Sequence, residues 1–190
     1  MITIIALLGV SCSGKDTIKK ELINLGMNSV VTTTTRPVRD GEVQDVAYHF
    51  VDKAQFQRLK EQGIFAETDS YNTDHGIWYY GTQFEDLKNH DNKVIILNPN
   101  GIKSIVGQMD IKDWLIVHVT CPDGILKDRL EKRGDNPREA SRRFKDDKIK
   151  FRNIDRFVDV EIVNDGSKTP EQLACIIKSL YDRHLKEKND

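Results

Sequence analysis

The residues of this chain best suited to chemistry lie in the segment from Gly9 to Thr17, which reads GVSCSGKDT. This segment matches the pattern G-x-x-x-x-G-K and lies between an apolar run and a stretch of helical periodicity, the context that a phosphate-binding loop requires. Glycines let successive backbone N–H groups point at phosphate oxygens, and the start of the next helix adds positive partial charge. The sequence therefore predicts that Lys15 reaches the β- and γ-phosphates of a nucleoside triphosphate.

The residue after this lysine is Asp16, where such loops normally carry a hydroxyl that contacts magnesium. Either Asp16 contacts Mg²⁺, directly or through water, or it turns away and Thr17 supplies the hydroxyl. The sequence leaves both arrangements open, and we predict both residues as magnesium-binding. The predicted ATP-binding residues of the loop are Gly9, Val10, Ser11, Cys12, Ser13, Gly14, Lys15, Asp16 and Thr17.

A phosphate loop alone is compatible with GTPases, ATPases and small-molecule kinases. The strand predicted over 94–97 ends at Asn98 instead of the aspartate of a Walker B element. The guanine-reading motif N-K-x-D is also absent, since Asn92-Lys93 continues into Val94. Both observations disfavour a switch GTPase.

A second group of polar residues follows the first helix. Arg36 and Arg39 lie three residues apart in a predicted turn, and two guanidinium groups so placed can clamp one phosphate, although a solvated charged loop is the ordinary alternative. Downstream, Glu67, Tyr80 and Thr82 offer a carboxylate, a phenol and a hydroxyl. A carboxylate that accepts from a ring N–H and an exocyclic amine would suit guanine, although exposed polar residues are usually only solvated.

Together these motifs resemble the guanylate kinase family. The resemblance rests on the phosphate loop, on T-T-R-x-x-R-x-G-E with Y-x-F, and then on F-x-E and Y-Y-G-T. It implies that arginines and tyrosines hold the acceptor phosphate, and that Glu67 reads guanine with help from two hydroxyls. The residues implied for the monophosphate site are Thr32, Arg36, Arg39, Glu42, Tyr48, Glu67, Tyr80 and Thr82.

The resemblance extends to a lid and to the adenine site. The stretch 129–134 resembles the entry to the family's lid, and Arg143 matches the lid arginine that bridges two phosphates, with Arg142 as a near alternative. Asn164 lies in a segment that resembles the adenine contact. Residues 127–152, around this lid, carry 11 basic and 6 acidic side chains. This excess could be a solvated helix face or a nucleic-acid patch. We favour a lid that closes over the triphosphate, because phosphoryl transfer needs cations over developing charge. The implied catalytic residues are Lys15, Arg36, Arg39, Arg133 and Arg143.

The chain also departs from the family. Asn98 and Asn100 stand where the family has the acids of L-D-x-D, so an acid that helps to read the base or to order magnesium is missing. Residues 71–78 look like an insertion, a loop longer than usual. Lys15-Asp16 also resembles ribose 1,5-bisphosphate phosphokinases, relatives that would not be expected to keep Glu42, Tyr48 and Glu67.

Apolar runs alternate with helical segments along the chain, which indicates a parallel sheet covered on both faces. Strands are predicted over 2–8, 29–34, 94–97, 114–121 and 158–163, and helices over 15–25, 101–109, 123–133 and 170–185. Ile18, Leu22 and Leu25 are predicted to share the buried side of the first helix, which Gly26 ends. Thr169 is the predicted N-cap of the last helix.

With the resemblance, this pattern predicts an α/β chain with the three-layer P-loop NTPase fold and a parallel central sheet. We expect one domain: a core of 1–31, 83–133 and 150–190, a small inserted α+β NMP-binding flap of 32–82, and a mobile lid of 134–149. Within the flap, short strand pieces are predicted near 48–51 and a helix over 54–62.

Composition narrows the possible classes. The 190 residues carry 29 basic and 30 acidic side chains. This balance argues against an overall positive charge that would attract nucleic acid or a membrane surface. No apolar run reaches the roughly 18 residues of a membrane span. The three cysteines are widely spaced, with no C-x-x-C motif and no zinc-ligand spacing, which is typical of a cytoplasmic protein.

We therefore expect a cytoplasmic kinase, monomer or homodimer, that uses ATP and Mg²⁺ to phosphorylate GMP or dGMP, without nucleic-acid or membrane partners. One alternative is a kinase of another phosphorylated acceptor, either a different nucleotide or ribose 1,5-bisphosphate. The other is a non-catalytic guanylate-kinase-like interaction module, against which Gly14, Lys15 and the two arginines argue.

Overall fold

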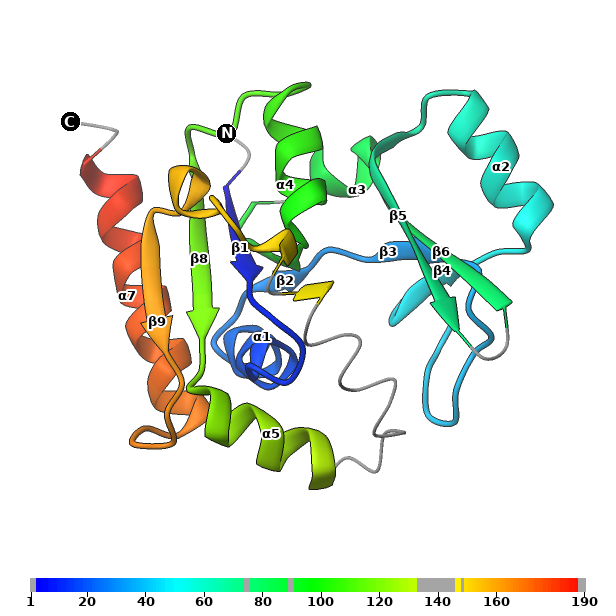
Figure 1. The fold of residues 1–190 in the computed structure, drawn as a ribbon. Helices are drawn as coiled ribbons and strands as arrows, with labels where there is room; N and C mark the ends of the chain where they lie inside the picture. The colour runs from blue at the N-terminus through cyan, green and yellow to red at the C-terminus, as the bar shows by residue number, and fades with distance from the viewer. Residues whose placement is uncertain (1–2, 74–75, 89–90, 133–145, 148, 188–190) are drawn as a thin grey trace.

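A computed structural model describes residues 3–73, 76–88, 91–132, 146–147 and 149–187. Within these residues, five strands form one sheet, and all of its neighbouring strands are parallel (Figure 1). The prediction of a parallel central sheet is confirmed. The strand order is β2 (Asn28–Ser29), β7 (Lys93–Ile96), β1 (Ile4–Leu8), β8 (Trp114–Thr120) and β9 (Val160–Val163).

Helices cover both faces of this sheet. The central strand β1 is fully buried, and its alternate residues enter two different apolar clusters. Ile5 packs in the cluster that contains α1 and α7, whereas Ile4 packs in the cluster that contains α4. The three predicted layers are therefore present. The helices of this unit are α1 (Lys15–Asn24), α4 (Pro99–Val106), α5 (Asp123–Lys132), the short 3₁₀ helix η1 (Asp155–Phe157) and α7 (Pro170–Glu187).

The ends of two helices test the predicted caps. The residue before α7, Thr169, accepts a hydrogen bond from the backbone N–H of Gln172, whose side chain accepts from the backbone N–H of Thr169 in return, so the predicted N-cap is confirmed. Gly26 has the left-handed φ of 89° expected after α1. The prediction for Leu25 is wrong: this residue is 40% exposed, because the helix ends at Asn24 and the chain leaves the helical path.

The single strand predicted over 29–34 is also wrong. Its first part is β2, which pairs with β7 in the central sheet, and its second part is β3 (Thr32–Thr34), which belongs to a second sheet. A β-branched run carries no signal about which sheet each residue joins. The second sheet lies to one side of the first in Figure 1, and its order is β4 (Tyr48–Phe50), β3, β6 (Gly76–Gln83) and β5 (Phe65–Thr73).

Two helices accompany the second sheet. They are α2 (Lys53–Glu61), capped by the side chain of Asp52, and α3 (Phe84–Lys88). The predicted helix over 54–62 is therefore confirmed within one residue at each end. The division of the chain into core, flap and lid stays a prediction, and most of the predicted lid lies outside the described residues.

Residues 71–73 and 76–78, predicted as part of an inserted loop, instead belong to strands β5 and β6. Strands β5 and β6 pair antiparallel from Phe65 and Gln83 to Thr73 and Gly76. Tyr71 lies opposite Trp78, so aromatic side chains support the pairing where a loop was expected.

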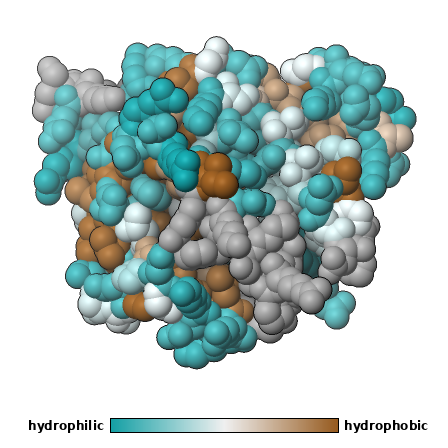
Figure 2. All heavy atoms as spheres, in the orientation of Figure 1, coloured by the Kyte–Doolittle hydropathy of each residue, from teal (hydrophilic) through white to brown (hydrophobic). Residues whose placement is uncertain are grey.

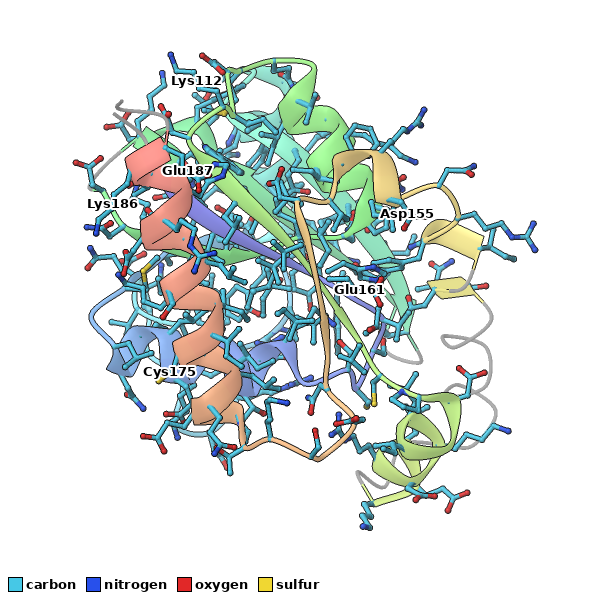
Figure 3. The ribbon with its side chains drawn as sticks, turned by 90° about the vertical axis from the view of Figure 1, so that its left-hand side faces the viewer. Lys112, Asp155, Glu161, Cys175, Lys186 and Glu187 are labelled. Atoms are coloured by element: carbon cyan, nitrogen blue, oxygen red, sulfur yellow. The ribbon has the colours of Figure 1, made fainter. Side chains whose placement is uncertain are left out.

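The surface agrees with an ordinary folded domain. On the face in Figure 2, hydrophilic side chains predominate and apolar ones occur in small groups. No helix of the described residues combines the length and the apolar character needed to cross a bilayer. None of the three cysteines forms a disulfide, and Cys175 is exposed on α7, the helix nearest the viewer in Figure 3.

The contact between α7 and the sheet yields a stability prediction. Ile177 is fully buried, whereas its neighbour Ile176 is 37% exposed. We expect Ile177→Ala to lower the free energy of unfolding by about 2–5 kcal/mol, since it leaves a cavity in the core. Urea unfolding should show this loss, with Ile176→Ala as the matched control. Equal effects of the two substitutions would contradict the packing described for this helix.

Candidate active site

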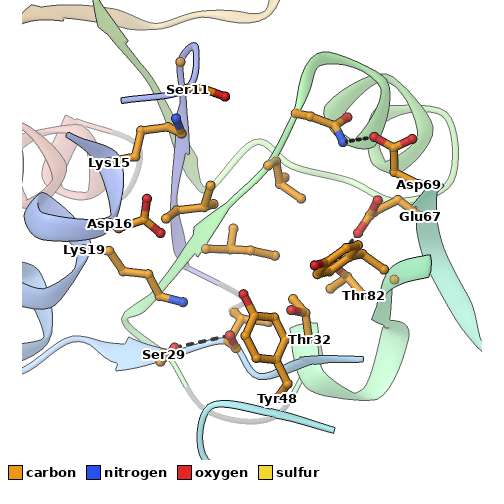
Figure 4. Close-up of a pocket in the computed structure, with 18 of the residues that line it drawn as sticks. Ser11, Lys15, Asp16, Lys19, Ser29, Thr32, Tyr48, Glu67, Asp69 and Thr82 are labelled. Carbon is orange, nitrogen blue, oxygen red and sulfur yellow. Dashed lines mark hydrogen bonds between the residues drawn. The ribbon is translucent and has the colours of Figure 1, made fainter. Parts of the chain in front are cut away.

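A cavity of about 490 Å³ lies between the carboxyl ends of β1 and β7, the start of α1, and the second sheet (Figure 4). Its two ends differ in charge. Lys15 and Lys19 of α1 line one end, with Asp16 between them, and Glu67 and Asp69 of β5 line the other. One end of the cavity therefore suits an anion, and the other suits a group rich in hydrogen-bond donors.

The phosphate loop connects β1 to α1 at the lysine end. Cys12 and Gly14 have left-handed φ values of 62° and 98°, and the backbone N–H of Ser13 donates to the carbonyl oxygen of Val10 at 3.2 Å. At Gly9, a Cβ atom would lie 2.4 Å from the carbonyl oxygen of Val119 on β8. The loop is thus a tight turn against the central sheet, and this contact explains why a glycine begins it.

Two side chains hold the loop from behind. Arg129 donates through Nη1 to the carbonyl oxygens of Cys12 and Ser13, at 3.3 and 3.4 Å, and through Nη2 to Oδ1 of Asn164 at 3.2 Å. The Nδ2 of Asn164 donates to the Ser13 carbonyl at 2.8 Å. Because Asn164 is 7% exposed and both atoms of its amide have protein partners, it supports the loop here. Its contact with adenine stays a prediction.

The Lys15 ammonium is also directed at the loop. Its Nζ donates to the carbonyl oxygen of Val10 at 2.7 Å and lies 3.5 Å from Oγ of Ser13. Burial lowers the pKa of Lys15, and the nearby carboxylates of Asp16 and Asp147 oppose that shift. The lysine is therefore held at the cavity wall before any phosphate is bound.

A carboxylate already binds one amide of this loop. The backbone N–H of Ser11 donates to Oδ2 of Asp147 at 2.6 Å, across 136 residues of sequence. Ser11 and Asp147 both line the cavity. An anionic oxygen therefore fits this amide, as phosphate binding by the loop requires.

The residues present also fit a magnesium ion of the kind that accompanies nucleotides. Asp16 is exposed and lines the cavity beside Lys15, whereas Thr17 is exposed and does not line it. Among the described residues, no group of three or more His, Cys, Asp or Glu side chains could hold a metal ion. Because Mg²⁺ usually takes only one or two carboxylates together with substrate phosphates, the single carboxylate of Asp16 is sufficient.

The opposite end is built around Glu67. The Oγ1 of Thr82, a fully buried residue, donates to Oε1 of Glu67 at 2.6 Å. Burial raises the pKa of Glu67, the Thr82 hydrogen bond lowers it, and the neighbouring Asp69 raises it further. A Cβ at Gly101 would lie 3.3 Å from Oε2, so this glycine lets α4 approach the carboxylate closely.

Aromatic rings complete this end of the cavity. Tyr80 lies edge-on to Tyr48 and to Tyr71, with ring centroids 6.3 and 5.5 Å apart, and all three residues line the cavity. Lys150 lies over the Tyr71 ring, with its Nζ 5.3 Å from the centroid. Such a wall suits a flat base.

The two predicted phosphate-clamping arginines are not among the described residues that line the cavity. Arg36 is 5% exposed, and its guanidinium group forms two hydrogen bonds with Glu42, at 2.7 and 3.0 Å, while lying 5.3 Å from the Tyr48 ring. Arg39 is exposed, and its backbone N–H donates to Glu42. The Arg36 hydrogen bond lowers the pKa of Glu42. Glu42 thus contacts an arginine here. Among the described residues that line the cavity, Arg36, Arg39 and Glu42 are all absent.

The cavity brings together about half of the predicted site residues. Those that line it are Gly9, Ser11, Lys15, Asp16, Thr32, Tyr48, Glu67, Tyr80 and Thr82. Val10, Cys12, Ser13 and Gly14 shape the phosphate loop without lining the cavity. Arg133 and Arg143, together with the alternative Arg142, lie outside the described residues.

Sequence reasoning missed several lining residues. Lys19 lies one helical turn after Lys15, so its spacing could have revealed it. Asp69 and Tyr71 follow Glu67 at intervals of two, a strand pattern that the predicted insertion concealed. Asp147 carried no usable signal, since its position depends on contacts between distant segments.

Comparison with known proteins identifies the family and the fold. The family model described as guanylate kinase matches residues 1–180. The chain is 33% identical over 182 residues to the guanylate kinase of Sulfurimonas denitrificans, covering 92% of this chain and 85% of that one. It is 32% identical over 170 residues to the guanylate kinase of a Nostoc species, covering 85% and 82%. The crystal structure of guanylate kinase from Anaplasma phagocytophilum shares the fold, with a TM-score of 0.69, 20% identity, and coverage of 96% and 86%.

The half-buried carboxyl group of Glu67 leads to a pH-dependent prediction. The pKa of Glu67 is raised above 4.5 in the folded chain, so folding favours its protonated form. Ionised Glu67 therefore costs stability, increasingly so as the pH rises from 4.5 through the folded-state pKa. We expect Glu67→Gln to raise the melting temperature near neutral pH and to lose this gain as the pH falls towards 4.5.

Thermal unfolding over a pH series measures this effect. The exposed Glu131→Gln is the matched control, and its melting temperature should follow the parent chain throughout. A gain for Glu67→Gln that stays the same at every pH would contradict the explanation by ionisation.

Proposed function

The chain belongs to the guanylate kinase family, and we propose that it transfers the γ-phosphoryl group of ATP to GMP or dGMP, giving ADP and the nucleoside diphosphate. One observation carries this proposal. One cavity has a phosphate loop at one end and a half-buried carboxylate, oriented by Thr82, at the other. Two nucleotides can therefore meet with their phosphates in between.

At the donor end, the protein supplies positioning and positive charge. The loop amides and Lys15 hold the phosphate oxygens, and Lys15 neutralises charge that develops during transfer. Arg129 and Asn164 keep the loop rigid from behind. Asp147 leaves the Ser11 amide when phosphate oxygens arrive, because both need the same N–H group.

Magnesium belongs to the same end of the cavity. Asp16 would hold Mg²⁺ together with phosphate oxygens, and Thr17 stays the alternative that the sequence suggested. The ion would supply neutralisation of the transferring phosphoryl group.

At the acceptor end, Glu67 accepts hydrogen bonds from the base, and the tyrosine wall orients the ring. Thr32 and Thr82 contribute hydroxyl groups. The acceptor phosphate is already an anion, so the reaction needs no strong general base, and positioning dominates the catalysis.

Arginines complete the proposed site. We assign Arg36 and Arg39 to the acceptor phosphate, with Glu42 holding the Arg36 fork in a defined orientation before substrate binds. Arg133 and Arg143 are proposed as the cations that close over the phosphates and exclude water. We further propose that the protein acts in the cytoplasm, as a monomer or homodimer, without nucleic-acid or membrane partners, in keeping with its net charge of -1.

An assay that couples ADP release to a colour change tests the function. The acceptors are GMP, dGMP, AMP, UMP, dTMP and ribose 1,5-bisphosphate, and we expect the highest kcat/KM with GMP or dGMP. A clear preference for any other acceptor would replace the proposal with the corresponding kinase. Absence of activity with all of them, together with no thermal shift on adding ATP, would instead favour an interaction module.

The phosphate-loop lysine gives the sharpest catalytic prediction. We expect Lys15→Ala to reduce kcat by about a hundredfold or more, the scale seen when a transition-state donor is lost. Steady-state kinetics with ATP and GMP measure this loss. The control is Lys60→Ala, an exposed lysine of α2, which should retain the parent rate. Near-normal turnover of Lys15→Ala would remove this lysine from the catalytic assignment.

The carboxylate on the loop gives a second kinetic prediction. Asp147→Ala should lower the KM for ATP by about two- to tenfold, because phosphate oxygens then have no competitor for one loop amide. Initial rates at varied ATP and saturating GMP measure it, with the exposed Asp128→Ala as control. A higher KM for ATP would mean that Asp147 assists donor binding.

A further inference from the structure

The acceptor end of the cavity carries a second carboxylate in addition to Glu67. Asp69 is two residues further along β5, so both side chains lie on the same face of the strand. Their partners on β6 are Thr82 and Tyr80 respectively. Both carboxylates line the cavity, and Figure 4 shows them side by side opposite the phosphate loop.

The orientation of Asp69 is fixed on two sides. Its Oδ2 accepts a hydrogen bond from Nδ2 of Asn98 at 2.6 Å, and its Oδ1 accepts one from the backbone N–H of Ser70 at 2.8 Å. A carboxylate oxygen can accept two hydrogen bonds. The Tyr71 hydroxyl is a third protein partner of this carboxylate. Three of its roughly four acceptor positions are therefore used by the protein, and about one is left for a ligand in the cavity.

Asn98 is itself held in one orientation. Its Oδ1 caps α4 by accepting from the backbone N–H groups of Asn100 and Gly101, at 2.9 and 2.8 Å. The other side of the amide must then present its N–H donors to β5, where Nδ2 also lies 3.3 Å from the hydroxyl of Tyr71. An aspartate at position 98 would put a second carboxylate against Asp69, at a separation where like charges repel. The amide at 98 and the carboxylate at 69 are thus complementary.

Two adjacent acceptors beside an aromatic wall select for two adjacent donors. The guanine ring offers them as its ring N–H and its exocyclic amino group, whereas hypoxanthine offers only the ring N–H. We propose that Asp69 is a specificity-determining residue, which accepts a hydrogen bond from the exocyclic amino group while Glu67 accepts from the ring N–H. This inference rests on the proposed function. Asp69 on β5 would supply the base-reading acid that is absent after β7, where the chain has Asn98.

The consequence is discrimination between GMP and IMP, which differ by that amino group alone. A site built to bind a donor group disfavours the analogue that lacks it, because the half-buried Asp69 carboxylate then lacks one of its hydrogen-bond donors. Removal of the Asp69 carboxylate should therefore cost activity with GMP while sparing activity with IMP.

The experiment measures kcat/KM for GMP and for IMP with the 190-residue chain. We expect Asp69→Ala to reduce the preference for GMP over IMP by about tenfold or more, mainly through slower reaction of GMP. Asp69→Asn, which preserves the shape of the side chain, should reduce the preference in the same direction. Ser70→Ala is the matched control, since its exposed side chain lies on the opposite face of β5.

The possible results separate the two levels of inference. A parent chain that phosphorylates GMP, with its preference unchanged in both Asp69 variants, overturns the role of Asp69 and leaves the proposed function standing. An equal loss with GMP and IMP, accompanied by a lower melting temperature, assigns Asp69 a structural role and also overturns the proposal. A parent chain inactive with every purine monophosphate overturns both this inference and the proposed function.

Discussion

The site depends first on the way the carbonyl groups of the phosphate loop are satisfied. A loop that points its N–H groups at an anion must direct carbonyl oxygens elsewhere, and buried carbonyls need donors. Arg129 of α5 and Asn164 after β9 provide them, and both contact the Ser13 carbonyl. In the strand order, β8 and β9 lie on the other side of β1 from β7. The loop is therefore held by elements that follow these two strands. The shape of the donor-binding loop consequently depends on how α5 and the end of β9 pack in the core.

The second constraint is electrostatic. The cavity places lysines of α1 opposite carboxylates of β5. Each of these carboxylates is oriented by a neutral donor: Thr82 donates to Glu67, and Asn98 donates to Asp69. Such neutral partners hold a carboxylate in place without cancelling its charge. Arg36 is treated differently, since Glu42 occupies its guanidinium fork outside the cavity. The carboxylates of the cavity thus keep their charge for a ligand, whereas the charge of Arg36 is paired with Glu42 until the acceptor phosphate proposed for it binds.

The predictions from sequence were most accurate where the signal is local. The parallel sheet, the helix after the phosphate loop and the cap at Thr169 follow from periodicity and turn chemistry, which depend on neighbouring residues. Errors occurred where a choice between partners was needed. The strand over 29–34 was divided between two sheets, and the loop expected over 71–78 is paired strand at 71–73 and 76–78. Neither outcome is encoded in the residues of the segment alone.

The sequence by itself determined the strand–loop–helix unit around Lys15, the candidate base-reading carboxylate Glu67 and the resemblance to one kinase family, because each depends on residue types at short, regular spacing. Tertiary structure alone decided that Asp69 meets Asn98, that Asp147 binds the Ser11 amide and that both predicted clamp arginines lie outside the cavity. The physical reason is that the first two contacts join residues 29 and 136 positions apart. Their distance is set by strand order and helix packing, which local periodicity does not specify.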